Sequence, residues 1–196
     1  MNRMIFGLLL AVCVLQAAPA AAKEPKWRVS ATGGLLDEKK SAFTKTDEGS
    51  SVGVEVARKL GSSIELGVDI SHAPVAYETT VPFFGMIKMD IKNTFFLLSF
   101  NFRPVRSVYL GVLGGVTDRS LELSSGPDDI NLTAGTFGFK AGYDLFLSER
   151  FSIGVQAQHV SVGKAEKTIT DDNQEVTYKL DSTSFSKYLL AIGYRF

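Results

Sequence analysis

Residues 182–196, S-T-S-F-S-K-Y-L-L-A-I-G-Y-R-F, end the chain and decide its fold. Every second position, counted back from the last residue, carries a large apolar or aromatic side chain: Phe196, Tyr194, Ile192, Leu190 and Tyr188. The positions between them are small or charged, apart from one leucine. Because successive side chains of a strand point to opposite faces, this stretch is predicted to be a β-strand with one apolar face. A strand of a soluble domain rarely ends the chain on an aromatic residue in this way, because the final residues usually fray.

The same alternation recurs about eight times along the chain, as expected for strands with one lipid-facing side. The fourth of these stretches also carries Phe95 and Leu97 on its other face, which leaves its phase open. The predicted outward positions before the last strand are Trp27, Val29, Ala31; Val52, Val54, Val56; Ile64, Leu66, Val68, Ile70; Phe96, Leu98, Phe100, Phe102; Leu110, Val112, Val116; Phe137, Phe139, Ala141, Tyr143, Leu145; and Phe151, Ile153, Val155, Ala157.

The connections between these stretches alternate in length. Short turns are predicted at 58–62, 103–106 and 147–150, and long polar links at 37–50, 73–89, 118–131 and 163–181. This order is typical of an up-and-down membrane barrel, whose periplasmic turns are short and whose external loops are longer. The link 73–89 also contains several apolar residues. They either extend the sheet above the membrane or present an apolar surface, and Pro74 and Pro82 argue against one regular strand there.

Composition limits the class of protein. The chain has 196 residues, a formal net charge of +0 and 45% hydrophobic residues, so no basic excess points to nucleic acid. Residues 1–22 are predicted to be a cleaved secretory signal, with Arg3, the apolar run 5–15 and a small-residue cleavage site. The only cysteine, Cys13, lies in that signal, so the exported domain, 23–196, is expected to have no disulfide.

These patterns together predict an all-β protein, an eight-stranded antiparallel up-and-down transmembrane β-barrel. Alternation alone does not exclude a soluble, lipocalin-like barrel, which would bury the apolar face and expose the charged one. The loop asymmetry, the export signal and the terminal Phe196 favour the membrane version. No apolar run after the signal is long enough for a transmembrane helix, so the chain is expected to cross the membrane as a closed barrel.

The signal, the alternating strands, the loop pattern and the final Tyr194-Arg195-Phe196 resemble the small outer-membrane barrels of the OmpA, OmpX and OmpW type. The resemblance implies a monomer in the outer membrane of a Gram-negative bacterium, in contact with membrane lipid and lipopolysaccharide. It also implies that the last strand (Tyr188, Leu190, Ile192, Tyr194 and Phe196) is recognised by the barrel-assembly machinery.

Charged side chains occupy the inward positions: Arg28, Glu55, Glu65, Asp69, Lys140, Asp144, Lys187 and Arg195. Closure of the barrel puts the last strand beside the first, so the basic residues of these two strands are expected near the acidic ones. An eight-stranded barrel is only wide enough for side chains to fill, and unpaired charges in it would be costly. The prediction is a filled interior of paired charges that fixes the register, and the alternative is a gate or narrow polar path.

His159 and Ser161 lie on the predicted lipid-facing side near the outer end of the seventh strand. A histidine placed on a serine is the minimal activated nucleophile, provided that a third group orients the imidazole. This pair resembles the His-x-Ser-Asn motif of the PagL type of lipid A deacylase, although Val162 replaces the asparagine of the oxyanion site. Glu166 or Glu175 would supply the acid. The alternative is that His159 and Ser161 are polar residues at the membrane interface, and no catalytic residue is assigned.

The sequence predicts no metal site and no cofactor. Asp128-Asp129 and Asp171-Asp172 lack the ligand spacing of a calcium loop, and His72 has no ligand-like neighbours. The function expected from the sequence is non-enzymatic: a structural or surface-interaction protein of the outer membrane. The alternatives are a narrow channel for small or hydrophobic solutes and, third, a lipid A deacylase-like hydrolase.

Overall fold

Eight long strands form a barrel wall in the computed structural model, which describes residues 26–39, 44–45, 49–81, 85–123, 130–171 and 174–196. They are β1 (Trp27–Lys39), β3 (Gly49–Lys59), β4 (Ile64–Val81), β5 (Gly85–Val105), β6 (Val108–Leu123), β7 (Ile130–Phe146), β8 (Phe151–Val162) and β11 (Thr183–Arg195). A short strand, β2 (Thr44–Lys45), pairs with β4, and β9 (Ala165–Asp171) pairs with β10 (Gln174–Leu180) as a separate hairpin. Among the described residues, no helix is long and apolar enough to cross a membrane. The predicted signal, 1–22, lies outside the described residues.

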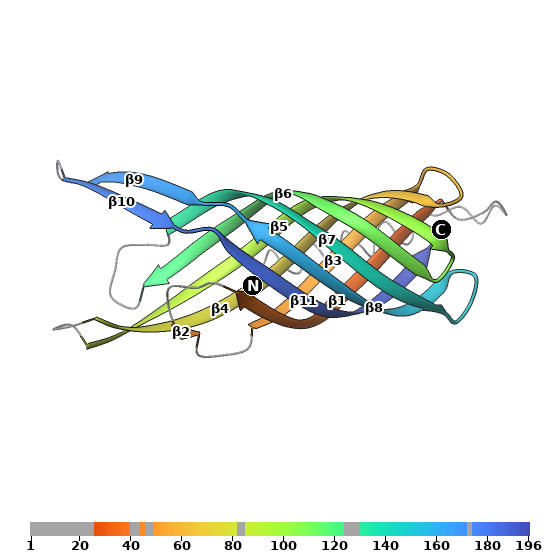
Figure 1. Ribbon diagram of the computed structural model, residues 1–196, viewed down its shortest axis with the longest axis horizontal. Helices are drawn as coiled ribbons and strands as arrows, with labels where there is room; N and C mark the ends of the chain where they lie inside the picture. The colour runs from red at the N-terminus through yellow and green to blue at the C-terminus, as the bar shows by residue number, and fades with distance from the viewer. Residues whose placement is uncertain (1–25, 40–43, 46–48, 82–84, 124–129, 172–173) are drawn as a thin grey trace.

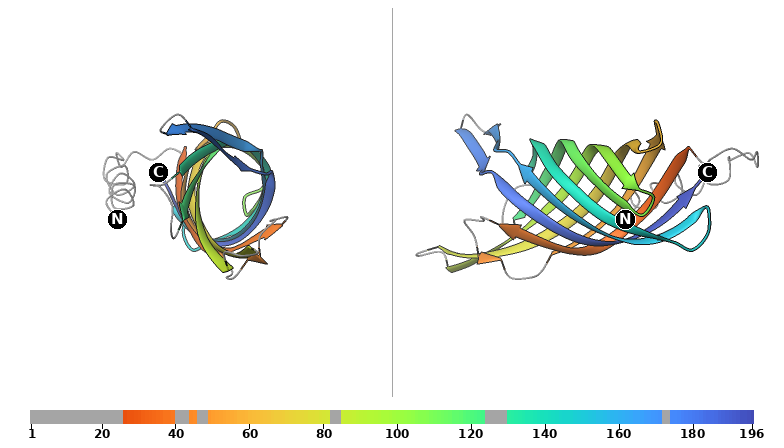
Figure 2. Two further views of the ribbon diagram at one scale, coloured as in Figure 1. Left: turned by 90° about the vertical axis from the view of Figure 1, so that its left-hand side faces the viewer. Right: turned by 45° about the vertical axis from the view of Figure 1, so that its right-hand side comes forward.

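The strands close on themselves as an antiparallel ring (Figure 2), so the predicted fold class is confirmed. The ring follows the order β4-β3-β1-β11-β8-β7-β6-β5 and is completed by the pairing of β4 with β5. One row of paired outward residues runs around the whole wall: Asp37, Ser186, His159, Phe139, Val112, Phe100, Leu66, Arg58 and Trp27. The row leaves β1 at Asp37 and returns to it at Trp27, and this stagger corresponds to strands tilted by roughly 40°.

The seam between the first and last strands closes the ring. β1 and β11 pair from Arg28 opposite Arg195 to Lys39 opposite Ser184. The ladder is extended at its end by two backbone hydrogen bonds between Trp27 and Phe196, of 2.9 and 3.0 Å. The final aromatic residue is therefore fixed to the start of the barrel.

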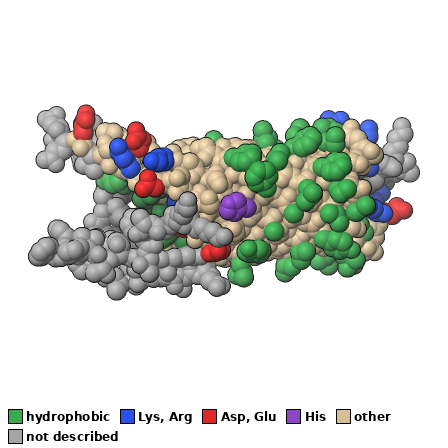
Figure 3. Space-filling view, viewed as in Figure 1, with side chains coloured by type: hydrophobic (Ala, Val, Ile, Leu, Met, Phe, Trp, Pro, Cys, Tyr) green, Lys and Arg blue, Asp and Glu red, His purple; other side chains and the backbone are tan. Residues whose placement is uncertain are grey.

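The outward face of the wall is apolar, as the alternation predicts. The large side chains at outward positions are exposed, for example Leu190 at 66% and Leu98 at 62%, because only lipid would cover them. Val29 shares the outward parity but is only 8% exposed. On the face shown in Figure 3, hydrophobic side chains are gathered over one half of the barrel wall, and charged side chains lie toward the two ends of the molecule.

The two ends of the barrel differ, again as predicted. Short turns join β3 to β4, β5 to β6 and β7 to β8 at one end, here called the turn end, where the C-terminus also lies (Figure 1). The opposite end, here called the hairpin end, carries the β9–β10 hairpin and the extensions of β4 and β5. One turn was placed wrongly, because Arg103 lies within β5 and faces inward rather than in the predicted turn 103–106.

The predicted long links are largely strand. β4 continues to Val81 through Pro74, so the expectation that proline would prevent a regular strand there is wrong. Pro74 pairs opposite Lys92 of β5, while the ladder on its other side ends at Val52 opposite His72. Proline is tolerated because its missing N–H falls where no β3 partner remains. Pro82 and residues 83–84 lie outside the described residues.

The interior is layered, which corrects the prediction of a polar filling throughout. Charged and polar side chains fill the half toward the turn end, whereas the half toward the hairpin end holds buried apolar side chains, here called the apolar layer. Phe95 and Leu97 belong to it, which settles the open phase of β5. The larger members of the apolar layer are Leu36, Val75, Tyr77, Ile91, Phe95, Leu97, Leu113, Leu121, Ile130, Leu132, Val160, Val162, Leu180 and Phe185.

Adjacent glycines on β1 provide a test of the seam. A methyl group added at Gly34 would collide with the backbone carbonyl oxygen of Tyr188 on β11, whereas one added at Gly33 meets nothing within 4 Å. We expect Gly34→Ala to lower the free energy of unfolding by about 1–3 kcal/mol, since the backbones must separate. Gly33→Ala should change it by less than about 0.5 kcal/mol. Urea unfolding in lipid vesicles measures both, and equal effects would contradict the close approach at the seam.

Candidate functional site

The charges of the turn-end half meet at Glu55, a residue of β3 that is 1% exposed. Arg28 donates a hydrogen bond of 2.9 Å to one carboxylate oxygen of Glu55. The other oxygen accepts hydrogen bonds from Lys140, from Ser99 at 2.8 Å and from Asn101 at 3.2 Å. The carboxylate is therefore held by residues of β1, β5 and β7, strands on both sides of the barrel.

A second group of charges lies nearer the turn end, around Arg103. Its guanidinium lies 2.8 Å from Glu65 and 3.0 Å from Asp144. Glu65 is also 3.3 Å from Arg28 and 3.9 Å from Arg195, so the two groups share members. Three arginines, from β1, β5 and β11, thus surround Glu65 of β4, and two of them, Arg28 and Arg195, are opposite each other across the seam.

Tyr109 of β6 stands among these cations. Its ring centroid is 4.7 Å from the Arg103 guanidinium and 5.9 Å from that of Arg28, distances at which a cation is attracted to an aromatic face. Its hydroxyl donates a hydrogen bond of 2.8 Å to Gln156 of β8, on the other side of β7. Gly142 on β7 makes room for the ring, because a methyl group there would collide with it.

Asp69 and Lys187 lie between the charged half and the apolar layer. Asp69 accepts a hydrogen bond of 3.1 Å from Gln158. Lys187 donates one of 2.8 Å to Ser71, and its ammonium group lies 3.5 Å from the centroid of the Phe95 ring. A lysine buried at the base of the apolar layer is therefore satisfied by a hydroxyl group and an aromatic face.

Together these contacts form one network that crosses the barrel. The structure places all eight predicted interior charges on the inward face and brings six of them, Arg28, Glu55, Glu65, Lys140, Asp144 and Arg195, into it by ion pairs. Asp69 and Lys187 have neutral hydrogen-bonding partners instead. The sequence reasoning missed Arg103 and Tyr109. Arg103 shares the parity of Ser99 and Asn101, a signal that the preference for a turn at Pro104 concealed.

A smaller polar cluster, the Arg119 cluster, lies among the apolar side chains of the hairpin-end half, with Asn93 between Ile91 and Phe95 on the inward face of β5. Arg119 donates a hydrogen bond of 3.1 Å to Asn93 and one of 3.5 Å to the backbone carbonyl of Asp181, and it lies 3.9 Å from Glu38. Glu38 also accepts a hydrogen bond of 2.8 Å from Thr183. The cluster joins β1, β5 and β6 to the end of the β9–β10 hairpin.

His159 lies on the outward face, but its hydrogen-bonding partner is not the predicted Ser161. Its Nδ1 is 3.2 Å from the hydroxyl of Ser186, which is opposite it on β11, and Ser161 is 3.2 Å from Ser184. Sequence reasoning missed Ser186 and Ser184, because their positions opposite β8 depend on the register of the closed barrel.

This outward arrangement lacks the order of a hydrolytic triad. Asp37 is opposite Ser186 on the far side from His159, so the serine lies between the acid and the imidazole in the row. A triad needs the imidazole in the middle, with the acid orienting it. The backbone N–H groups of β8 and β11 that face the ladder between these strands donate to carbonyl oxygens across it, so they are not directed at an oxyanion. The geometry does not favour hydrolysis here.

No group of three or more histidine, cysteine, aspartate or glutamate side chains within the described part of the chain is arranged to hold a metal ion.

Comparison with known proteins agrees with the architecture. The family model of the outer membrane protein beta-barrel domain matches residues 6–196. Among solved structures, Neisserial surface protein A has a TM-score of 0.56 at 10% identity, with 87% of this chain and 97% of that chain covered. Ail, the attachment invasion locus protein of Yersinia pestis, has a TM-score of 0.55 at 15% identity, with 89% of this chain and 100% of that chain covered. The outer membrane protein OprG from Pseudomonas aeruginosa has a TM-score of 0.54 at 12% identity, with 88% of this chain and 97% of that chain covered. No curated protein matches the chain.

Removal of the Glu55 side chain tests whether the interior network supports the fold. Glu55→Ala leaves Arg28 and Lys140 without their shared carboxylate, so we expect a loss of about 3–5 kcal/mol in the free energy of unfolding. The matched control is Glu166→Ala, which removes an exposed ion pair of 3.4 Å with Lys179 and should cost less than about 0.5 kcal/mol. Urea unfolding in vesicles of one lipid composition compares the two variants. An unchanged free energy of unfolding in Glu55→Ala would show that the network does not contribute to stability.

Proposed function

The chain belongs to the outer membrane protein β-barrel domain family, and from this premise we propose that it is a closed barrel of the outer membrane with a structural or surface-interaction role. The observation that supports this proposal best is that two kinds of packed side chains fill the interior. A charged network occupies the turn-end half, and an apolar layer lies above it.

The charged network opposes ion flow because its members are paired with one another. An ion passing Glu55 would have to replace Arg28 and Lys140, both of which are buried and paired to it. Breaking one buried pair costs several kcal/mol, and here the pairs are linked through shared carboxylates. The network therefore acts as a packed polar core rather than as the lining of a water-filled path.

The apolar layer opposes passage for a different reason. Phe95 and Phe185 meet edge to face across the interior, with ring centroids 5.6 Å apart, and both are 0% exposed. Apolar side chains offer no hydrogen bond to replace the hydration shell of an ion or polar solute. A solute would thus meet two barriers of opposite chemical character.

The hairpin end carries the surface that remains for interaction with other molecules. The Arg119 cluster anchors the β9–β10 hairpin, whose described residues include exposed charged side chains such as Glu166 and Lys179. We infer that this hairpin and the extended β4–β5 pair, held on a rigid wall, face the outside of the cell and carry the interactions of the protein.

Conductance in planar bilayers tests the closed state. We expect the refolded protein to give no stepwise currents. Phe95→Ala with Phe185→Ala removes only the apolar barrier, so currents should appear when Glu55→Ala also breaks the charged network. The control combines Glu55→Ala with Phe96→Ala and Phe100→Ala, which removes two phenylalanine rings from the lipid face and should stay silent. Reproducible wild-type steps that change in Lys140→Ala would overturn the closed barrel in favour of the channel.

Limited proteolysis tests the anchoring of the hairpin. Arg119→Ala removes the hydrogen bonds to Asn93 and to the Asp181 carbonyl, so cleavage by chymotrypsin at Tyr178 should become roughly tenfold faster. The control, Lys92→Ala, removes a partly exposed ion pair with Glu122 and should leave that rate within about twofold. Equal rates in both variants and the wild type would show that the hairpin does not depend on Arg119.

A further inference from the structure

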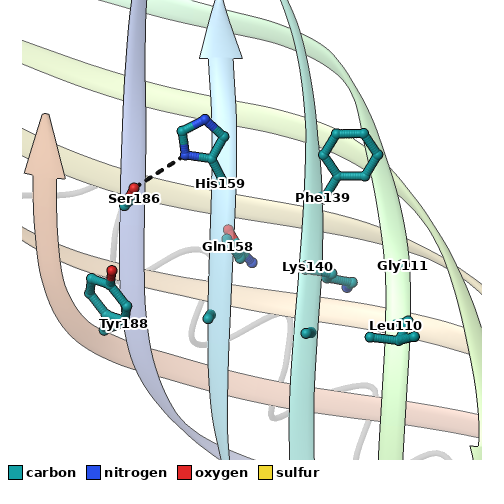
Figure 4. Close-up of a pocket in the computed structure, with 10 residues that line it drawn as sticks. Leu110, Gly111, Phe139, Lys140, Gln158, His159, Ser186 and Tyr188 are labelled. Atoms are coloured by element: carbon teal, nitrogen blue, oxygen red, sulfur yellow. Dashed lines mark hydrogen bonds between the residues drawn. The ribbon is translucent and has the colours of Figure 1, made fainter. Parts of the chain in front are cut away.

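A groove of about 480 Å³ lies on the lipid-facing side of the wall, where β6, β7 and β8 run side by side next to β11. Its floor is formed by the methyl groups of Ala141 and Ala157, which face each other across the β7–β8 ladder. Leu110, Phe139 and Tyr188 stand around this floor (Figure 4). Two alanines side by side among large side chains leave a depression in the apolar belt at this point.

One end of the groove is polar. His159 and Ser186, joined by the hydrogen bond of 3.2 Å, border it, and the second ring nitrogen of His159 is directed away from the serine (Figure 4). From Phe151, at the turn end of the belt, to His159 the strand rises ~20 Å along the barrel axis at a tilt of about 40°. An apolar band is about 25 Å tall in such barrels, so this polar rim lies close to the boundary between acyl chains and headgroups.

The chemistry of the rim indicates which lipid fits. His159 and Ser186 can donate to an ester carbonyl or exchange hydrogen bonds with a hydroxyl group. Asp37, the next outward residue in the row beside Ser186, disfavours a phosphate at this point and favours hydroxyl donors. A phospholipid places a phosphate directly above its acyl chains, whereas the glycolipid of the outer leaflet joins its acyl chains to sugars and carries its phosphates only at the two ends of the disaccharide.

We propose that the groove binds one acyl chain of the outer-leaflet glycolipid, lipid A of lipopolysaccharide, with His159 and Ser186 hydrogen-bonded to its ester or hydroxyl oxygens. The groove is continuous with the lipid-facing belt, so its occupant comes from the membrane itself. The site is independent of the interior and of the hairpins. It would give the barrel a fixed lipid at one position of its circumference, and it needs no bond cleavage.

Native mass spectrometry of the refolded protein tests this site. The protein is refolded with equal amounts of phosphatidylethanolamine and deep-rough lipopolysaccharide, and the lipid retained after detergent exchange is identified. We expect one glycolipid to stay on the wild type. Ala157→Leu and Ala141→Leu, which fill the floor from two strands, should each weaken its retention at least roughly tenfold.

The matched control is Ala31→Leu, which adds the same volume at an outward position of β1 between Ile192 and Val54, outside the groove. It should retain the glycolipid as the wild type does. In the double variant His159→Ala, Ser186→Ala, retention of the glycolipid should fall roughly threefold to tenfold. Equal retention in the groove variants and Ala31→Leu would overturn the site. Preferential retention of phosphatidylethanolamine would overturn the glycolipid, and loss of an acyl chain from the bound glycolipid would overturn a purely binding role.

Discussion

Closure of the sheet at the β1–β11 seam is the constraint on which the rest of the structure depends. In the hydrocarbon of a membrane each unpaired N–H or C=O group costs several kcal/mol, so a spanning sheet must leave no edge. Here the seam is paired along the length of β11 and continues to the last residue through the Trp27–Phe196 hydrogen bonds. The register of this seam also fixes the stagger of the whole wall, and therefore which side chains meet inside and outside it.

Within that wall the interior must be filled, and this chain fills it in two ways. Near the turn end, charged groups neutralise one another around Glu55 and Glu65, in contact with the aromatic ring of Tyr109. Nearer the hairpin end, aromatic and aliphatic side chains pack as in a soluble core. A buried network of charges specifies geometry better than it stabilises, since each pair must compensate for its own desolvation. We interpret the two halves as having different roles. The charges set the register of the strands, and the apolar layer stabilises the barrel by packing.

Much of the fold follows from the sequence because its governing signal is local. Alternation along each strand identified the outward faces, and the contrast between short and long connections distinguished the two ends. What the sequence did not reveal depends on register, which joins residues far apart in the chain. Ser186 becomes the partner of His159 only because the closed sheet places β11 opposite β8 at that position. The apolar layer was missed for a related reason, since Phe95 and Leu97 look like a second outward face until their strand has neighbours.

The alternation that builds the wall also separates its two surfaces. Lys140 and Gln158 face the interior, while Phe139 and His159, their immediate neighbours on the same strands, face the lipid. A substitution on one face therefore leaves the chemistry of the other largely unchanged, and the interior can be specialised for sealing without limiting what the outside binds. In the closed barrel that we propose, recognition is left to the hairpins and to the lipid-facing side. On that side the pair of small residues Ala141 and Ala157, beneath a hydrogen-bonded polar pair, marks one position of the circumference.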